Sequence, residues 1–184
     1  CVAQRITEAD AAQKHDPITG MYNSQKIRSG IQRAILSRLN FALVYIEMVN
    51  VPNFTREHGV AVRDKAFRYM ARLISNWAAN ANCSLFEAGH MGAGHFVCLL
   101  EPDKANAFCA ELLEQWQEVL NKLYPSMPSK NDGLPDLSLI LCATGSGSVG
   151  AYATHEYFDT LSQLRTKALA SGESGLFLDK RRKF

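Results

Sequence analysis

Residues 90–96 read His-Met-Gly-Ala-Gly-His-Phe and lie between two apolar runs, at residues 83–88 and 96–100. Two apolar runs separated by a short glycine-containing segment are typical of a β-hairpin, so we interpret residues 90–96 as its turn. The turn contains no carboxylate, and its polar groups are backbone carbonyls and imidazoles. Because hard divalent cations prefer oxygen ligands, the turn is poorly suited to holding one.

Hydrophobic periodicity predicts helices and strands on both sides of the hairpin. The first helix is capped by Ser24, and its apolar positions are Ile27, Ile31, Ala34, Ile35 and Leu39. Before the hairpin we further expect a buried strand at 41–48, a short helical turn at 53–58 and a long helix at 60–78. After it we expect a helix from about 104 to 123, a loop at 124–136, a strand at 137–143, a helix at 154–170 and a strand at 175–178.

The order of these elements predicts an α+β fold, an α/β sandwich with a mixed central β-sheet flanked by helices. Residues 1–14 read as a connecting helix. Residues 15–23 read as a turn-rich segment, interrupted by Pro17 and Gly20. A length of 184 residues fits one domain of ordinary size.

Composition and charge give no support for a nucleic-acid-binding, membrane-spanning or secreted protein. A formal net charge of +2 gives no argument for nucleic acid or for an anionic membrane surface as a partner. No apolar stretch reaches the ~18–20 residues that cross a membrane, and no secretory signal pattern is present. The five cysteines form no Cys-x-x-Cys pair, which indicates reduced, mostly buried thiols in a cytoplasmic protein. The basic run at residues 180–183 reads as a solvated tail or linker.

Four stretches, taken in their order and spacing, resemble the GGDEF domain, the fold of diguanylate cyclases, over roughly residues 10–178. They are residues 15–23, 41–64, 92–96 and 168–174. The resemblance implies a nucleotidyl-cyclase-like palm fold for residues 15–178. It also implies that residues 1–14 join an upstream sensor domain. Residues 179–184 would then form a basic tail, or a linker to a downstream EAL phosphodiesterase domain.

The same resemblance assigns the family's metal-binding positions to residues of this chain that mostly lack a carboxylate. The first metal-binding aspartate falls on Glu47, and the second acidic residue of that pair falls on Val49. At the hairpin the metal-binding acid falls on Gly94, and the acid after it falls on His95. The product-inhibition motif Arg-x-x-Asp is replaced by Cys-Ser-Leu-Phe at residues 83–86.

Positions that contact the nucleotide in the family differ as well. The substrate-contacting asparagine falls on Thr55. The guanine-reading aspartate is kept as Asp64, but its usual glycine neighbour is Arg63. The lysine and arginine that neutralise the triphosphate fall on Leu169 and Glu173, so an anion stands where a cation is needed.

These departures predict a degenerate GGDEF domain that is not an enzyme and uses no cofactor. The first functional hypothesis is a regulatory module of cyclic-di-GMP signalling that acts on neighbouring domains or on a partner protein. The alternative is a GTP-binding sensor without turnover, with a residual nucleotide site made of Glu47, Thr55, Asp64, Gly92, Ala93 and Gly94. Residual cyclase activity, a third hypothesis, requires two metal-binding carboxylates.

Simpler interpretations of two of these residues stay open at this point. Glu47, at the end of a buried strand, could be solvated. Asp64, near the start of a long helix, could complement the positive end of the helix dipole.

Two competing motifs also need to be weighed. His90 and His95 with Cys83 and Cys98 suggest zinc, but their spacing matches no usual zinc site. Residues 145–150 (Gly-Ser-Gly-Ser-Val-Gly) have the form of a dinucleotide-binding fingerprint. The expected helix begins several residues after the last glycine, which favours a plain loop.

Overall fold

The structure, a computed structural model, describes residues 14–123, 136–146 and 153–181. Several predicted segments lie outside these residues. They are the connecting helix at residues 1–14 except for Lys14, the loop at 124–136 except for Asp136, residues 147–150 of the glycine-rich segment and residues 182–184 of the basic tail.

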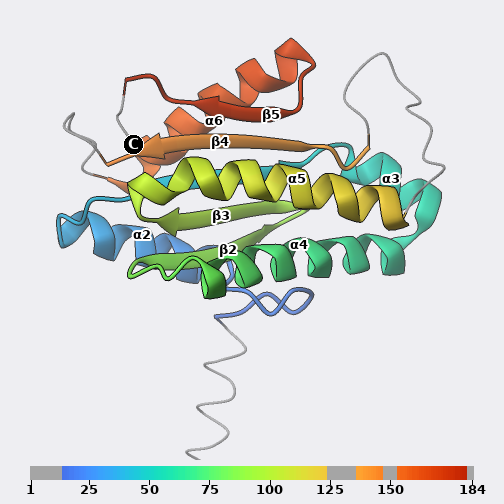
Figure 1. The fold of residues 1–184 in the computed structure, drawn as a ribbon, viewed down its shortest axis with the longest axis horizontal. Helices are drawn as coiled ribbons and strands as arrows, with labels where there is room; N and C mark the ends of the chain where they lie inside the picture. Colours follow the sequence, from blue (N-terminus) through green and yellow to red (C-terminus); the bar gives the residue numbers. More distant parts are fainter. Residues whose placement is uncertain (1–13, 124–135, 147–152, 182–184) are drawn as a thin grey trace, which may run out of the picture.

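The described residues form a five-stranded mixed sheet with helices on both of its faces (Figure 1). The strand order is β2-β3-β1-β4-β5, and only the β4–β5 pair is parallel. This arrangement confirms the predicted α+β fold. The elements are α2 (Ser24–Leu36), β1 (Ala42–Met48), α3 (Val51–His58), α4 (Val60–Asn80), β2 (Phe86–Gly92), β3 (His95–Leu100), the 3₁₀ turn η1 (Pro102–Lys104), α5 (Ala105–Leu123), β4 (Leu139–Gly145), α6 (Thr154–Ser171) and β5 (Gly175–Leu178).

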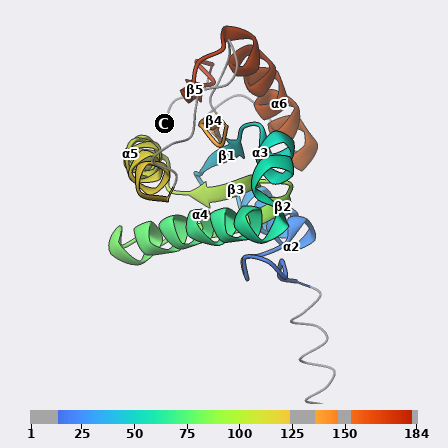
Figure 2. The same ribbon diagram turned by 90° about the vertical axis from the view of Figure 1, so that its right-hand side faces the viewer.

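Alternation along the central strand β1 creates two hydrophobic cores. One set of side chains (Ala42, Val44, Ile46 and Met48) packs in the core with α3, α4 and α5. The other set, which includes Leu43 and Tyr45, packs in the core with α2 and α6. Figure 2 shows the sheet with α4 and α5 on one side and α2 and α6 on the other. Glu47 lies on the same face of β1 as Leu43 and Tyr45, so its side chain points toward α6 rather than into bulk solvent.

The predicted helices and strands within the described residues are present, and the differences lie at their ends. The cap of α2 is Asn23 rather than Ser24, because the Asn23 side chain accepts a hydrogen bond from the Lys26 amide at 3.0 Å. Leu39 was predicted to pack from this helix, but α2 ends at Leu36 and Leu39 is 45% exposed.

The hairpin turn is shorter than predicted. His90 and Met91 belong to β2, because His90 still pairs with Phe96 and a register shift then pairs Gly92 with His95. Only Ala93 and Gly94 lie between the two strands.

The C-terminal tail also begins later than predicted. Asp179 is buried, and its backbone amide donates to the Ala143 carbonyl at 2.9 Å. Its carboxylate accepts a hydrogen bond from the Arg181 guanidinium at 2.8 Å, so both residues belong to the domain.

Two further predictions concern the thiols and the membrane. Cys98, Cys109 and Cys142 are buried and Cys83 is half-buried, and all four are free thiols, as predicted. Within the described ranges, every helix is too short or too polar to span a membrane.

Candidate functional site

A cavity of about 720 Å³ opens where several segments of the fold meet. Its walls come from the N-terminal turn (residues 14–23), the end of β1, α3, the start of α4, the β2–β3 hairpin and α6. Four residues of the predicted nucleotide site line this cavity: Glu47, Thr55, Gly92 and Ala93. The other two, Asp64 and Gly94, lie outside its lining.

Glu47 is bound by an arginine from α6. The Arg165 guanidinium donates to both carboxylate oxygens, from Nε to Oε2 at 2.5 Å and from Nη2 to Oε1 at 2.8 Å. The Glu47 side chain is only 9% exposed, which contradicts its interpretation as a solvated residue. The hydrogen bonds to Glu47 raise the pKa of Arg165, so the guanidinium stays charged. The carboxylate expected to bind a metal therefore already has a cation.

His95, which lines the cavity, and Tyr45, which does not, lie beside this ion pair. The Tyr45 hydroxyl and His95 Nδ1 are 2.7 Å apart, and the two rings are stacked. Burial raises the pKa of Tyr45 to about 12, with a further contribution from the Glu47 charge. Burial lowers the pKa of His95, although the Glu47 charge opposes this effect. Both groups are therefore neutral near pH 7, and the tautomer of His95 sets which of them donates the hydrogen bond.

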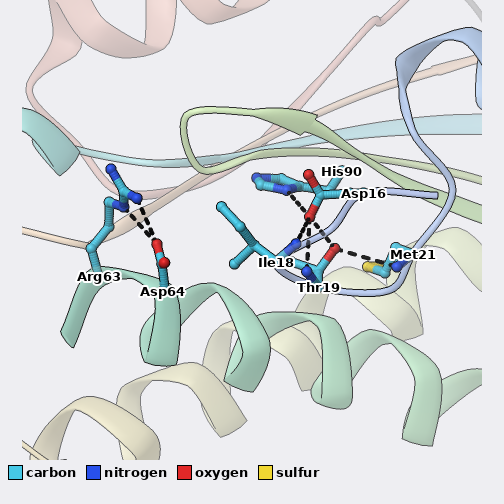
Figure 3. Close-up of polar contacts among 7 residues, drawn as sticks. All are labelled: Asp16, Ile18, Thr19, Met21, Arg63, Asp64 and His90. Carbon is cyan, nitrogen blue, oxygen red and sulfur yellow. Dashed lines mark hydrogen bonds and ion pairs between the residues drawn. The ribbon is translucent and has the colours of Figure 1, made fainter. Parts of the chain in front are cut away.

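The first turns of α4 hold the retained acid, Asp64. Arg63 donates to Asp64 Oδ1 from Nε at 2.9 Å and from Nη2 at 2.6 Å (Figure 3). Asp64 lies beyond the first turn of α4, where the helix dipole has little effect, so the helix-dipole interpretation is weak. In α3, the Thr55 hydroxyl donates to the Val51 carbonyl at 2.7 Å.

On the opposite wall, the N-terminal turn is organised by Asp16. Its Oδ1 accepts hydrogen bonds from the amides of Ile18 and Thr19, at 3.1 and 2.8 Å, and from the Thr19 hydroxyl at 2.8 Å (Figure 3). His90 Nδ1 lies 3.0 Å from the same oxygen. Burial alone would raise the pKa of Asp16, but the contacts with His90 and Thr19 outweigh it and lower that pKa.

His90 connects this turn to the sheet. Its side chain is 1% exposed and stacks on Phe96, with 4.6 Å between the ring centroids. Its backbone amide donates to the Tyr22 carbonyl at 2.8 Å. The ring lines the cavity, and Nε2 has no hydrogen-bond partner among the described residues. The N-terminal turn is therefore attached to β2 by both backbone and side chain.

The hairpin backbone is tightly constrained at the position of the missing acid. Ala93 and Gly94 both have positive φ, +52° and +82°. A Cβ atom added to Gly94 would lie 2.8 Å from a Val51 methyl and 3.2 Å from the Phe67 ring. Gly94 therefore allows close packing of the hairpin against α3 and α4.

The chemistry of the cavity does not fit a divalent metal ion. Glu47 is held by Arg165, and no group of three or more His, Cys, Asp or Glu residues in the described chain could hold a metal. His90, His95, Cys83 and Cys98 do not come together as such a group among the described residues. The last described part of the glycine-rich segment ends at Ser146, and α6 begins at Thr154.

Leu169 and Glu173, to which the family resemblance assigns phosphate binding, carry no positive charge. Leu169 lines the cavity and is 39% exposed, while Glu173 is exposed just after α6. Arg165 is the cation that α6 directs toward Glu47, and that contact uses two of its nitrogens.

Comparison with known proteins gives a match in three-dimensional structure only. No family model matches the chain. No curated protein sequence matches it either. The coiled coil and GGDEF domain of DgcB from Caulobacter crescentus, in complex with c-di-GMP, superposes with a TM-score of 0.70 at 15% identity, covering 97% of this chain and 92% of that one. The chain has a GGDEF-domain fold.

Two further structures place the GGDEF fold next to other components. Vibrio cholerae LapD, solved as S helix-GGDEF-EAL and bound to c-di-GMP, matches with a TM-score of 0.75 at 10% identity. That match covers 96% of this chain and 39% of LapD. The diguanylate cyclase SiaD from Pseudomonas aeruginosa, in complex with its activator SiaC, matches with a TM-score of 0.65 at 14% identity. It covers 97% of this chain and 66% of SiaD.

The sequence analysis missed the contacts that three residues, Arg165, Asp16 and His90, make at this GGDEF-fold cavity. Arg165 lies on the core-facing side of α6, since Tyr157, Leu161 and Ala168 on the same side are buried. A lone arginine among buried positions indicates a buried acidic partner, and this signal was available. Asp16 and His90 come from distant segments, so no local pattern could have paired them.

Proposed function

We propose that this chain is a non-catalytic GGDEF-fold module that regulates by contact within a cyclic-di-GMP signalling protein. The observation that carries the proposal is the ion pair between Glu47 and Arg165. The one acidic side chain left at the expected metal position is bound on both oxygens by a guanidinium of the same chain. The hairpin supplies no second carboxylate, and the other acid that lines the cavity, Asp16, has its Oδ1 occupied by Ile18, Thr19 and His90. The cavity therefore lacks the set of free oxygen ligands that a hard cation requires.

The phosphate side of the cavity supports the same proposal. A nucleoside triphosphate carries several negative charges and needs matching cations. At the positions that the resemblance assigns to phosphate binding, the chain has Leu169, which lines the cavity, and Glu173. The guanidinium that α6 contributes to the cavity, that of Arg165, is already paired with Glu47. Binding a triphosphate would require Arg165 to leave Glu47 unpaired, at a cost in free energy.

The regulatory part of the proposal rests on how the chain enters the domain. The N-terminal turn is attached to β2 through Asp16, Tyr22 and His90, next to the cavity. A displacement of this turn would therefore act directly on the hairpin side of the sheet. The neighbouring S helix and EAL of LapD, and the activator bound to SiaD, support a role in which such a fold transmits state to adjacent components. The free thiols support a reducing, cytoplasmic location.

The test is a cyclase assay on the purified chain with GTP and either Mg²⁺ or Mn²⁺. SiaD, a diguanylate cyclase of the same fold, serves as the positive control. We expect no cyclic-di-GMP above the level of a protein-free sample. Metal-dependent formation of cyclic-di-GMP that a Glu47→Ala variant abolishes would contradict the proposal.

A GTP-binding sensor without turnover is the second candidate, and the cavity itself favours it. Its volume of about 720 Å³ lies within the range of small-molecule sites, and four of the predicted site residues line it. Titration with GTP separates the candidates. Saturable binding that Asp64→Ala abolishes would support the sensor over the contact-only module.

A further inference from the structure

We propose that Arg63 closes the base-binding side of the cavity by occupying Asp64 within the chain. This inference rests on the proposed function, because it explains why the retained acid does not make the module a nucleotide sensor. It is about the binding of a ligand's base near Asp64, whereas the cyclase assay tests catalysis that depends on metal and triphosphate binding.

The arrangement of Arg63 and Asp64 carries the inference. Two guanidinium nitrogens of Arg63 converge on Asp64 Oδ1, at 2.9 and 2.6 Å. Arg63 lines the cavity, whereas Asp64 does not. The guanidinium also lies over the Phe67 ring, 5.7 Å from its centroid. Figure 3 shows the Arg63 and Asp64 side chains turned toward one another at the start of α4. The guanidinium thus occupies Oδ1 of Asp64 and also borders the cavity that a ligand would use.

Arg63 presents to Asp64 the same kind of paired N–H donors that a guanine base would present. A carboxylate binds two neighbouring N–H donors well, and a guanidinium presents such a pair. The Watson–Crick edge of guanine presents a comparable pair of N–H donors. A guanine edge and the Arg63 guanidinium therefore compete for the same oxygen. A ligand that uses Oδ1 must displace Arg63, whereas Oδ2 receives no hydrogen bond from Arg63.

The expected strength of this block is modest. The side chains of Arg63 and Asp64 are 26% and 23% exposed, so solvent screens their attraction. A pair of this kind contributes up to about 1 kcal/mol, which corresponds to about a fivefold change in a dissociation constant. Arg63 therefore acts as a competitor that lowers the affinity of the site rather than as a permanent lock.

The experiment compares guanosine binding by the full chain and by Arg63→Ala, using two-dimensional NMR titration. Guanosine carries no phosphate, so the result does not depend on Leu169 or Glu173. Arg68→Ala is the matched control, because Arg68 is exposed on the same helix. We expect Arg63→Ala to bind guanosine about fivefold more tightly than the parent, and Arg68→Ala to bind like the parent.

Two further arms make the result specific. The gain in affinity on Arg63→Ala should be absent with adenosine, whose Watson–Crick edge lacks the paired donors. The gain in guanosine affinity should also disappear in the double variant Arg63→Ala/Asp64→Asn. Arg63→Gln should show the same gain as Arg63→Ala, which guards against an effect of helix stability. Equal affinities in the parent and Arg63→Ala, no guanosine binding by Arg63→Ala, or a gain that survives Asp64→Asn would each overturn the inference. None of these results would alter the cyclase assay, so the two proposals can fail separately.

Discussion

At the scale of single residues, the partner of Glu47 determines what this acidic side chain can do. The Glu47 side chain is 9% exposed, so removal of Arg165 leaves a nearly buried carboxylate without its cation. Arg165 itself is 36% exposed, which reduces the energetic effect through solvent screening. We expect Arg165→Met to lower the free energy of unfolding by about 2 kcal/mol, as measured by urea denaturation.

Arg33→Met is a matched control for this prediction. Arg33 also donates to a glutamate on the sheet, at 2.8 Å from Glu87 Oε1, but the Arg33 side chain is 54% exposed. Its loss should cost less than about 1 kcal/mol. Equal losses in the two variants would show that burial of Glu47 adds nothing to the strength of its ion pair.

Restoring an acid to the hairpin should not restore a metal site. Gly94 has φ = +82°, and a Cβ atom there would lie 2.8 Å from a Val51 methyl. We expect Gly94→Asp to cost about 1–3 kcal/mol of stability, because the side chain is strained and overpacks the core. We also expect no binding of Mn²⁺, followed by electron paramagnetic resonance, while Arg165 occupies Glu47. Micromolar Mn²⁺ affinity in this variant would contradict our account of the cavity.

The sequence brought four of the six candidate site residues to one cavity, but Asp64 and Gly94 lie outside its lining, and the contacts of the six could not be predicted. The order of the stretches that resemble the GGDEF family located Glu47, Thr55 and the hairpin, and these residues do line one cavity. The contact between Glu47 and Arg165 depends on how α6 crosses β1, and the two partners are separated by 118 positions in the sequence. Local patterns carry no information about such a contact.

At the scale of secondary structure, the N-terminal turn should respond to acid through Asp16. The folded-state pKa of Asp16 lies below its ordinary value, because its contacts with His90 and Thr19 outweigh the effect of burial. A lowered pKa means that the carboxylate contributes stability above its unfolded-state pKa. This contribution is lost as the pH falls through the folded-state pKa.

Asp16→Asn tests this expectation. The variant should be less stable than the parent by about 1 kcal/mol at pH 6, and the difference should shrink as the pH falls below 4. Urea denaturation at several pH values gives the stabilities, and hydrogen exchange of residues 14–23 shows whether the turn loosens. A difference that stays constant down to pH 3 would mean that the Asp16 charge contributes nothing.

The helices and strands themselves could be predicted from periodicity, and only their ends could not. The buried strands β1 and β4 are continuous apolar runs, because helices cover both faces of the sheet. The end of β2 depends on a register shift beside His90, which alternation does not encode. Asn23 and Ser24 are both good capping residues, so their types alone could not decide between them.

At the scale of the whole molecule, the cores protect the thiols. Burial raises the pKa of Cys109 and of Cys142 to about 12, and raises the pKa of Cys98 well above its usual value. Only a thiolate reacts readily. We expect iodoacetamide at pH 8 to leave these three cysteines unmodified in the native protein and to modify them in urea, as read by peptide mass spectrometry. Rapid native-state labelling of any of the three would show that its core opens.

The fold and its chemistry follow different constraints in this molecule. The fold matches that of GGDEF structures at only 10–15% identity, because apolar side chains of similar size can replace one another. A cation site has no such tolerance, since it depends on the number and position of a few oxygen atoms. The chain therefore keeps the architecture, while Arg165 and Arg63 bind the acids that line or border its cavity.

The central claim is that this cavity does not accept a metal–nucleotide complex. Calorimetric titration of the purified chain with GTP, with and without Mg²⁺, measures this directly. We expect no saturable heat that depends on Mg²⁺, because Glu47 is held by Arg165 and the phosphate positions lack free cations. Micromolar GTP binding that requires Mg²⁺ and is lost in Glu47→Ala would contradict the account.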